Sequence, residues 1–210
     1  MTAHRSMIRR AAAVAAAATA AVVLAACGGE SDSSAGHNGH EKTSSPTASA
    51  SAAQGKQNAA DVAFAKGMIP HHRQAVEMAE LAETRAQSSD VKKLAGEIKK
   101  AQDPEIKTLS GWLTSWGEEV PKEDEMSEHA GHSMSGMMTP EDMDKLEKAS
   151  GEAFDTAFLE MMVKHHEGAV EMAKTEQSDG SYQSAKDMAD EIITSQSAEI
   201  TRMNKLLGKS

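Results

Sequence analysis

The chain has 210 residues, enough for one domain with its own core, and it carries 22 Lys and Arg against 32 Asp and Glu, a formal net charge of −10. Aromatic residues make up only 3% of it. Nucleic acid is therefore excluded as an expected partner, because the phosphate backbone requires a basic surface. The negative charge favours cations.

Residues 1–26 have the pattern of a bacterial lipoprotein signal peptide. Three arginines lie among the first ten residues, residues 11–23 are small and almost all apolar, and Leu24-Ala25-Ala26-Cys27 follows. The apolar run is shorter than the roughly 20 residues that span a bilayer, which argues against a transmembrane anchor. We therefore expect a lipidated Cys27 and an extracytoplasmic protein held to the bacterial cell membrane by its lipid.

The lone cysteine also limits the chemistry of the folded part. With Cys27 lipidated, no cysteine remains for disulfides or for thiolate metal ligands. Residues 27–57 consist largely of Gly, Ser, Ala and Thr, a composition typical of a disordered tether. The folded domain is therefore expected at residues 58–210.

An internal repeat organises that domain. Asp61–Ala79 aligns with Asp155–Ala173 at an offset of 94 residues, and both segments contain Met-x-x-His-His followed by Ala-Val-Glu-Met-Ala. The same offset, without a gap, relates seven further residues to identical ones: Ala95, Glu97, Ile98, Gln102, Glu105, Ile106 and Leu113 match Ala189, Glu191, Ile192, Gln196, Glu199, Ile200 and Leu207. The chain thus contains two copies of one unit, at about 58–116 and 140–208.

Each unit is predicted to form two helices. Phe64, Met68, His71, Ala75 and Met78 are spaced 4, 3, 4 and 3 residues apart, which places them on one helical face. The polar stretches 87–90 and 177–181 suit the turns within the units. Two hairpins with one apolar face each can bury those faces only against each other. The predicted fold is therefore all-α, a four-helix bundle built from two repeated helical hairpins.

Prolines refine this prediction. Thr139 and Pro140 form a good start for the third helix, with a capping residue followed by proline at the first helical position. Pro70 and Pro104 interrupt helical patterns and are expected to kink or reset those helices. Residues 117–139 join the two hairpins.

The repeated Met-x-x-His-His motif predicts a metal site. Helix positions i and i+3 or i+4 are neighbours, so each sulfur and at least one imidazole can converge on one point. A second methionine follows on the same face, two turns on. If the first helices of the hairpins are adjacent, the two copies face each other inside the bundle. The candidate ligands are Met68, His71, His72, Met78, Met162, His165, His166 and Met172.

The segment that joins the hairpins is a second candidate. Four of the fourteen methionines and two histidines fall between Met126 and Met138. A solvated loop has no need of exposed thioethers, so this composition favours capture and release of a metal. Its candidate ligands are His129, His132, Met134, Met137 and Met138.

The ligand types indicate copper. Thioether and imidazole without thiolate suit Cu(I) best, with Cu(II) possible through the histidines. Calcium and magnesium need clustered oxygen ligands. No histidine has a glutamate three residues before it, so the Glu-x-x-His motif of di-iron bundles is absent from the sequence. Hydrolase elbows, phosphate loops and zinc-protease motifs are absent too. The sequence therefore favours a copper-binding protein without catalytic turnover.

Two other interpretations stay open. Methionine at helical spacing often fills cores, so the Met/His stripes could belong to a non-catalytic structural or protein-interaction module. A redox enzyme acting on cuprous ion would need a route for electrons or oxygen that the sequence does not reveal. A copper donor or acceptor protein is a further possible partner.

With both motifs in view, the chain resembles the family called domain of unknown function 305. The resemblance covers roughly Ala60 to Leu207 and includes Phe64, Met68, His71, His72, Ala75, Met78, Ala79 and their second copies. It implies a ferritin-like fold, secretion, and a link to copper binding and tolerance. It also implies that Met68, His71, His72, Met78, Met162, His165, His166 and Met172 are the family's motif residues here. Lys164 stands where the first unit has Pro70.

Overall fold

The computed structural model describes residues 56–122 and 135–209. The predicted signal peptide, Cys27 and the tether up to residue 55 lie outside these ranges. So do His129, His132 and Met134 of the joining segment. The predictions for these residues therefore stay predictions.

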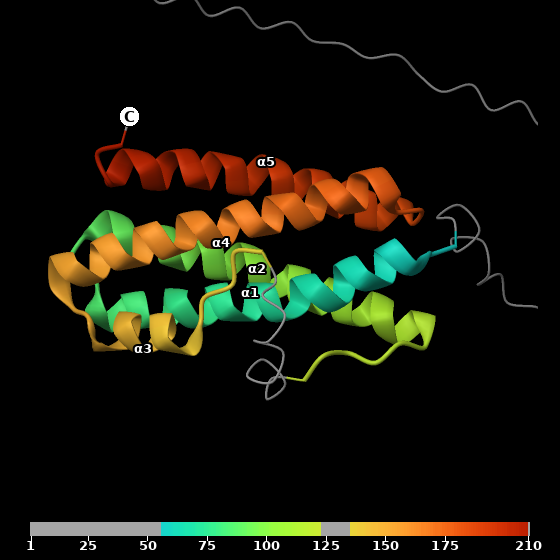
Figure 1. The fold of residues 1–210 in the computed structure, drawn as a ribbon, viewed down its shortest axis with the longest axis horizontal. Helices are drawn as coiled ribbons and strands as arrows, with labels where there is room; N and C mark the ends of the chain where they lie inside the picture. Colours follow the sequence, from blue (N-terminus) through green and yellow to red (C-terminus); the bar gives the residue numbers. More distant parts are fainter. Residues whose placement is uncertain (1–55, 123–134, 210) are drawn as a thin grey trace, which may run out of the picture. The chain divides into compact units, whose positions relative to one another are not determined.

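The described residues form five helices and no strand, which confirms the all-α class (Figure 1). Their bounds are α1 Ala59–Arg85, α2 Ser89–Trp116, α3 Pro140–Lys148, α4 Gly151–Asp179 and α5 Gln183–Leu206. Helix α1 packs along α2, α4 packs along α5, and the two hairpins meet through α1 and α4. Because α1 and α4 run in opposite directions in Figure 1, the middles of the two helices lie beside each other. The predicted bundle of two hairpins is confirmed.

The predicted start of the third helix is confirmed, and the structure adds a break that the sequence did not predict. Thr139 caps α3 through a capping box with Asp142, and Pro140 is the first helical residue. This helix ends after nine residues, and the long helix α4 begins only at Gly151. Gly151 has a φ of +65°, a conformation that glycine adopts far more readily than other residues. The chain therefore breaks between α3 and α4.

Neither interior proline ends its helix. Pro70 lies within α1 and Pro104 within α2, and both helices continue on each side. The turns fall at 86–88 and 180–182, overlapping or adjoining the polar stretches that predicted them.

The core consists of two apolar clusters separated by polar residues. The first apolar cluster includes Leu94, Ile98, Leu146, Phe154 and Phe158. The second apolar cluster includes Phe64, Ile69, Leu109, Leu113 and Ile192. Each cluster draws on both hairpins, so burial of apolar surface at both ends holds the hairpins together.

Two aspartates at equivalent repeat positions link the hairpins. Asp61 of α1 accepts hydrogen bonds from the backbone N–H groups of Ser181 (3.0 Å) and Tyr182 (2.9 Å), in the turn before α5. Asp155 of α4 accepts from the backbone N–H groups of Gln87 (3.1 Å) and Ser88 (2.8 Å), in the turn before α2. Each hairpin therefore caps the turn of the other with charge-assisted bonds.

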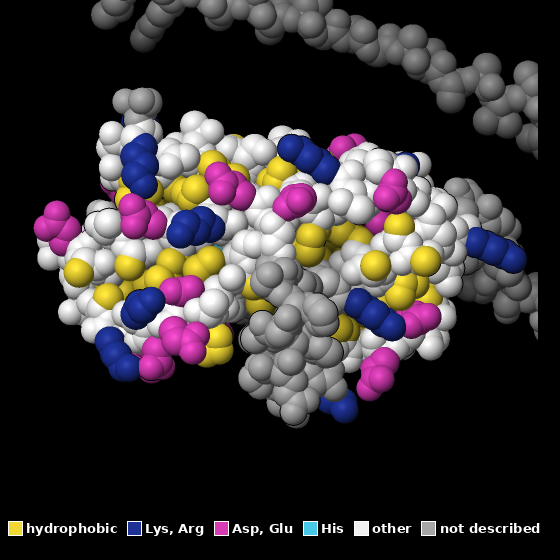
Figure 2. All heavy atoms as spheres, in the orientation of Figure 1, with side chains coloured by type: hydrophobic (Ala, Val, Ile, Leu, Met, Phe, Trp, Pro, Cys, Tyr) yellow, Lys and Arg dark blue, Asp and Glu magenta, His cyan; other side chains and the backbone are white. Residues whose placement is uncertain are grey.

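The surface carries both signs of charge. Figure 2 shows acidic and basic side chains spread among apolar patches on one face. Within residues 56–122 and 135–209, no helix has the length and apolar character required to cross a membrane.

Candidate metal centre

Four histidines lie in the middle of the bundle, between the two apolar clusters. His71 and His72 come from α1, His165 and His166 come from α4, and the exposed fraction of each is 0%. The rings of His71 and His165 face each other with centroids 3.8 Å apart and an interplanar angle of 41°. We call these four residues the histidine layer. The expectation that the two motifs face each other is confirmed.

Helices α2 and α5 add one carboxylate each to this layer. Glu105 Oε2 lies 2.7 Å from His72 Nε2, and Glu199 Oε2 lies 2.7 Å from His166 Nε2. The second contact is a hydrogen bond, whereas the first lacks the alignment of one. Both glutamates keep about a fifth of their side-chain surface exposed, at 21% and 22%. Each unit therefore supplies the same His-His pair and the same carboxylate.

The sequence had singled out Glu105 and Glu199, with Gln102 and Gln196, only as evidence of duplication. Both glutamines are buried in the structure, and each has a side-chain oxygen without a hydrogen-bond partner. The available signal was that polar residues recur at the 94-residue offset on faces that are otherwise apolar. That recurrence identifies a polar layer, but contact with the histidines needed the packed structure.

The imidazoles of the histidine layer are unusual in their lack of partners. Seven of their eight ring nitrogens are buried without a hydrogen bond, and His166 Nε2 is the exception. A buried polar group without a partner costs about 1–3 kcal/mol, and native proteins keep few of them. A carboxylate beside Nε2 favours the tautomer with its proton on that nitrogen, which leaves the Nδ1 lone pair free. The layer therefore presents lone pairs suited to a metal ion.

Burial keeps the facing pair neutral. Desolvation, with smaller contributions from His72 and His166, lowers the pKa of His71 to about 3. Desolvation also lowers the pKa of His165 well below its ordinary value, and the neighbouring histidines add to the effect. A metal requires the neutral imidazole, so protons compete with a metal at this pair only in strongly acidic solution. The sequence alone places that competition near the ordinary histidine pKa of about 6.5.

The motif methionines lie at different distances from the layer. Met68 and Met162 are fully buried, one helical turn before His71 and His165. Met78 is also buried, in the first apolar cluster, and Met172 packs partly exposed against the second. Seven residues correspond to about 10.5 Å along a helix, so these last two thioethers are remote from the facing histidines.

The described ends of the joining segment are attached beside the histidine layer. The Gln74 side chain donates to the Met138 carbonyl (3.0 Å) and accepts from its N–H (2.7 Å). Ser135 Oγ donates to Glu171 (2.6 Å), and Arg73 donates to the Pro121 carbonyl (2.6 Å).

Ser135, at the end of the joining segment that leads into α3, is also fixed by close contact between its backbone and α4. A Cβ atom on Gly168 would lie 2.0 Å from the Ser135 carbonyl oxygen, so only glycine fits at that position of α4. Met137 and Met138, which follow Gly136, are thereby placed next to α4.

The described residues do not form a complete metal site from His, Cys, Asp and Glu side chains alone. In residues 56–122 and 135–209, no group of three or more His, Cys, Asp or Glu side chains is placed to hold one ion. The layer offers instead the two facing imidazoles of His71 and His165. A pair of imidazoles with nearby thioethers suits a soft cation better than a hard one.

Comparison with known proteins shows a family and several solved relatives. The sequence matches the family described as domain of unknown function (DUF305) over residues 61–207. A DUF305 protein from Streptomyces coelicolor, described as secreted, is 33% identical; the match covers 71% of this chain and 93% of that one, with a TM-score of 0.65. No curated protein matches the chain.

Copper-bound structures are among these relatives. CopM in its Cu(II)-bound form is 36% identical, with 70% of this chain and 94% of that one covered and a TM-score of 0.61. CopM in its Cu(I)-bound form is 33% identical, with the same coverage of 70% and 94% and a TM-score of 0.58. CopM has also been solved in a silver-bound form.

Proposed function

The chain belongs to the DUF305 family, and from this premise we propose that it is an extracytoplasmic, membrane-tethered protein that buffers or carries copper without catalytic turnover. One observation carries the proposal: a fully buried pair of facing histidines whose four ring nitrogens have no hydrogen-bond partner. The copper- and silver-bound forms of CopM support it.

The histidine layer is the proposed holding site. His71 and His165 supply the nearest imidazoles, and Met68 and Met162 supply thioethers one turn away. This soft donor set favours Cu(I), and the imidazoles also accept Cu(II). The carboxylates of Glu105 and Glu199 compensate the charge of a cation held in an apolar surrounding.

The remaining candidate ligands have outer roles in this proposal. The joining segment captures copper before the layer holds it, and the attachment of Pro121 and Ser135 beside the layer supports that order. Met78 and Met172 are more distant thioethers of the bundle. The proposed ligands of the joining segment are His129, His132, Met134, Met137 and Met138.

The test is a titration of the purified chain with Cu(I) in the presence of a competing chelator, followed by Cu(II) and Zn(II). We expect His71→Leu with His165→Leu to weaken Cu(I) binding at the tightest site by at least about 100-fold, since two ligands are lost. Ile192→Val, a mild change in the second apolar cluster, is the control and leaves binding unchanged. Unchanged affinity in the double variant would remove the histidine layer from the proposal.

Membrane tethering has a separate test. Cys27 is the proposed lipid-bearing residue, and a single acyl-bearing cysteine is what holds the protein to the membrane. Cys27→Ala should therefore move the protein out of the membrane fraction of fractionated cells. Retention of the variant in that fraction would contradict the lipid anchor while leaving the copper site untouched.

A further inference from the structure

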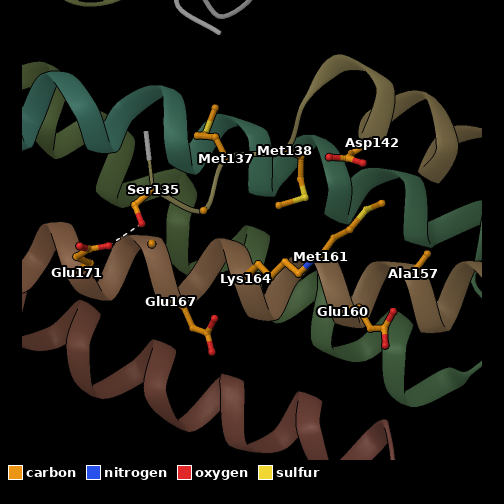
Figure 3. A pocket seen from close by; sticks show the side chains of 12 residues that line it. Ser135, Met137, Met138, Asp142, Ala157, Glu160, Met161, Lys164, Glu167 and Glu171 are labelled. Carbon is orange, nitrogen blue, oxygen red and sulfur yellow. Dashed lines mark hydrogen bonds between the residues drawn. The ribbon is translucent and has the colours of Figure 1, made fainter. Parts of the chain in front are cut away.

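A pocket of about 640 Å³ lies between α4 and the end of the joining segment. Thioethers line it from both sides, with Met137 and Met138 on the segment and Met161 on α4. In Figure 3 the Met138 side chain extends from the segment towards α4, and the Met161 side chain extends from α4 towards it. Two sulfur-bearing side chains from distant parts of the sequence thus line one pocket.

The position of Met138 is fixed by contacts that do not involve its sulfur. Gln74 holds both backbone groups of this residue, at 2.7 and 3.0 Å. Two residues earlier, Gly136 has a φ of +82°, and a Cβ there would lie 2.6 Å from the Lys164 carbonyl oxygen. The backbone that carries this thioether into the pocket is therefore fixed on both sides, as a built ligand site requires.

Packing alone does not account for this arrangement. Met138 and Met161 pack against the first apolar cluster, but each keeps part of its surface exposed to the pocket. The rest of the lining is polar, with carboxylates from Asp142, Glu160 and Glu167. A thioether facing carboxylates and solvent gains little from the hydrophobic effect.

The charges around the pocket favour a cation. The carboxylate of Glu171 joins the other three, and Lys164 is the cationic side chain of the lining. Lys145 and Lys209 pair with Asp142 (3.3 Å) and Glu160 (3.0 Å) at exposed positions. Exposed ion pairs are weak, so an entering cation displaces these lysines at little cost.

We propose that this pocket binds one soft monovalent cation, Cu(I) or Ag(I), through the sulfur atoms of Met138 and Met161. Neutral thioethers select such ions over calcium and magnesium. Met161 lies four residues before His165 on α4, so the pocket is an outer site one helical turn from the histidine layer. This inference rests on the proposed copper function and names a second site for it.

The test uses Ag(I), which does not change oxidation state, and the whole chain carrying ¹³C-methyl-labelled methionine. The background variant is His71→Leu with His165→Leu, so that the histidine layer does not compete. We expect the methyl signals of Met138 and Met161 to shift together and to saturate with the same equivalent of Ag(I). Met161→Leu, which conserves volume, should weaken the binding reported by Met138 by at least 10-fold.

Met188→Leu is the matched control, because Met188 is another partly buried methionine, packed against the second apolar cluster. It should leave the Met138 and Met161 shifts unchanged. Independent shifts of the two signals, or a Met138 response that survives Met161→Leu, would overturn the site. The histidine layer is tested separately by Cu(I) titration with intact His71 and His165, so either site can fail while the other stands.

Discussion

The two hairpins share the residues of the histidine layer, but several positions around that layer differ between them. The middle of each hairpin supplies two histidines and one glutamate to a shared layer, at the same repeat positions. Ala82 of the first hairpin corresponds to Glu176 of the second, and within residues 56–122 and 135–209 the short helix α3 accompanies only the second. Pro70 corresponds to Lys164, which lines the pocket between α4 and the end of the joining segment.

The physical reason for this contrast lies in what each region contacts. The histidine layer is formed by both hairpins across the α1–α4 contact, so a change in one half removes part of a shared arrangement. Outside the layer, equivalent positions contact different neighbours: Lys164 lines the pocket between α4 and the joining segment, whereas its counterpart Pro70 does not. The comparison therefore predicts equal effects within the histidine layer and unequal effects outside it.

The largest expected effect on copper affinity comes from replacing one or both of the facing histidines. If His71 and His165 share one ion, His71→Leu alone and His165→Leu alone should each weaken Cu(I) binding by about 100-fold, and the double variant by hardly more, because coupled groups are not additive. Competition titrations of the three variants measure this. Two separate sites would instead give single variants that each lose half the bound metal.

The next effect concerns the carboxylates. Glu105→Gln and Glu199→Gln should each reduce copper affinity by about 10- to 100-fold, because residues that orient metal-binding histidines have effects of this size. Glu97→Gln and Glu191→Gln are matched controls, since these exposed glutamates also recur at the 94-residue offset. If the control variants lost as much copper affinity as the test variants, the loss would come from reduced negative charge in general and not from contact with the histidines.

A smaller and unequal effect on stability is expected at Asp61 and Asp155, each of which caps the turn of the other hairpin. Asp61 is fully buried and accepts from three backbone N–H groups, whereas Asp155 accepts from two and is partly exposed. Asp61→Ala should lower the free energy of unfolding by about 2 kcal/mol and Asp155→Ala by about 1 kcal/mol, within the range for lost caps. Urea unfolding gives both values. A larger loss of unfolding free energy in Asp155→Ala than in Asp61→Ala would show that burial does not determine the contributions of the two aspartates.

The smallest effect is a pH dependence at Glu176 of the second hairpin, where the first hairpin has Ala82. Burial, together with hydrogen bonding to Asp61, raises the pKa of Glu176 to about 8. As an ionised group, neither of its oxygens would have a donor, whereas the protonated acid can donate to Asp61. The stability that Glu176 contributes is therefore complete below its ordinary pKa of 4.5 and is lost as pH rises through about 8.

Thermal unfolding between pH 5 and 9 tests this sign. The Tm of the unaltered chain should fall across this range relative to Glu176→Gln, which cannot ionise. Glu191→Gln, at an exposed position, serves as the control and should keep the pH dependence. A parallel pH profile in Glu176→Gln would exclude Glu176 as its source.

Much of the architecture follows from local sequence. The 4, 3, 4, 3 spacing around Met68 and His71 specifies helix, and the 94-residue repeat specifies two equivalent hairpins. The start of α3 was predictable because Thr139 and Pro140 act within one turn. The break before α4 was not, because it depends on one glycine conformation at residue 151 and on how α3 packs.

The candidate site divides in the same way. The sequence by itself determined the Met-x-x-His-His motifs and their softness as ligands, since ligand type is a property of each side chain. Only the tertiary structure decided that the rings of His71 and His165 face each other with centroids 3.8 Å apart, and that Glu105 and Glu199 reach His72 and His166. Helical periodicity fixes which face a residue occupies, but the crossing of two helices fixes which residues on those faces meet.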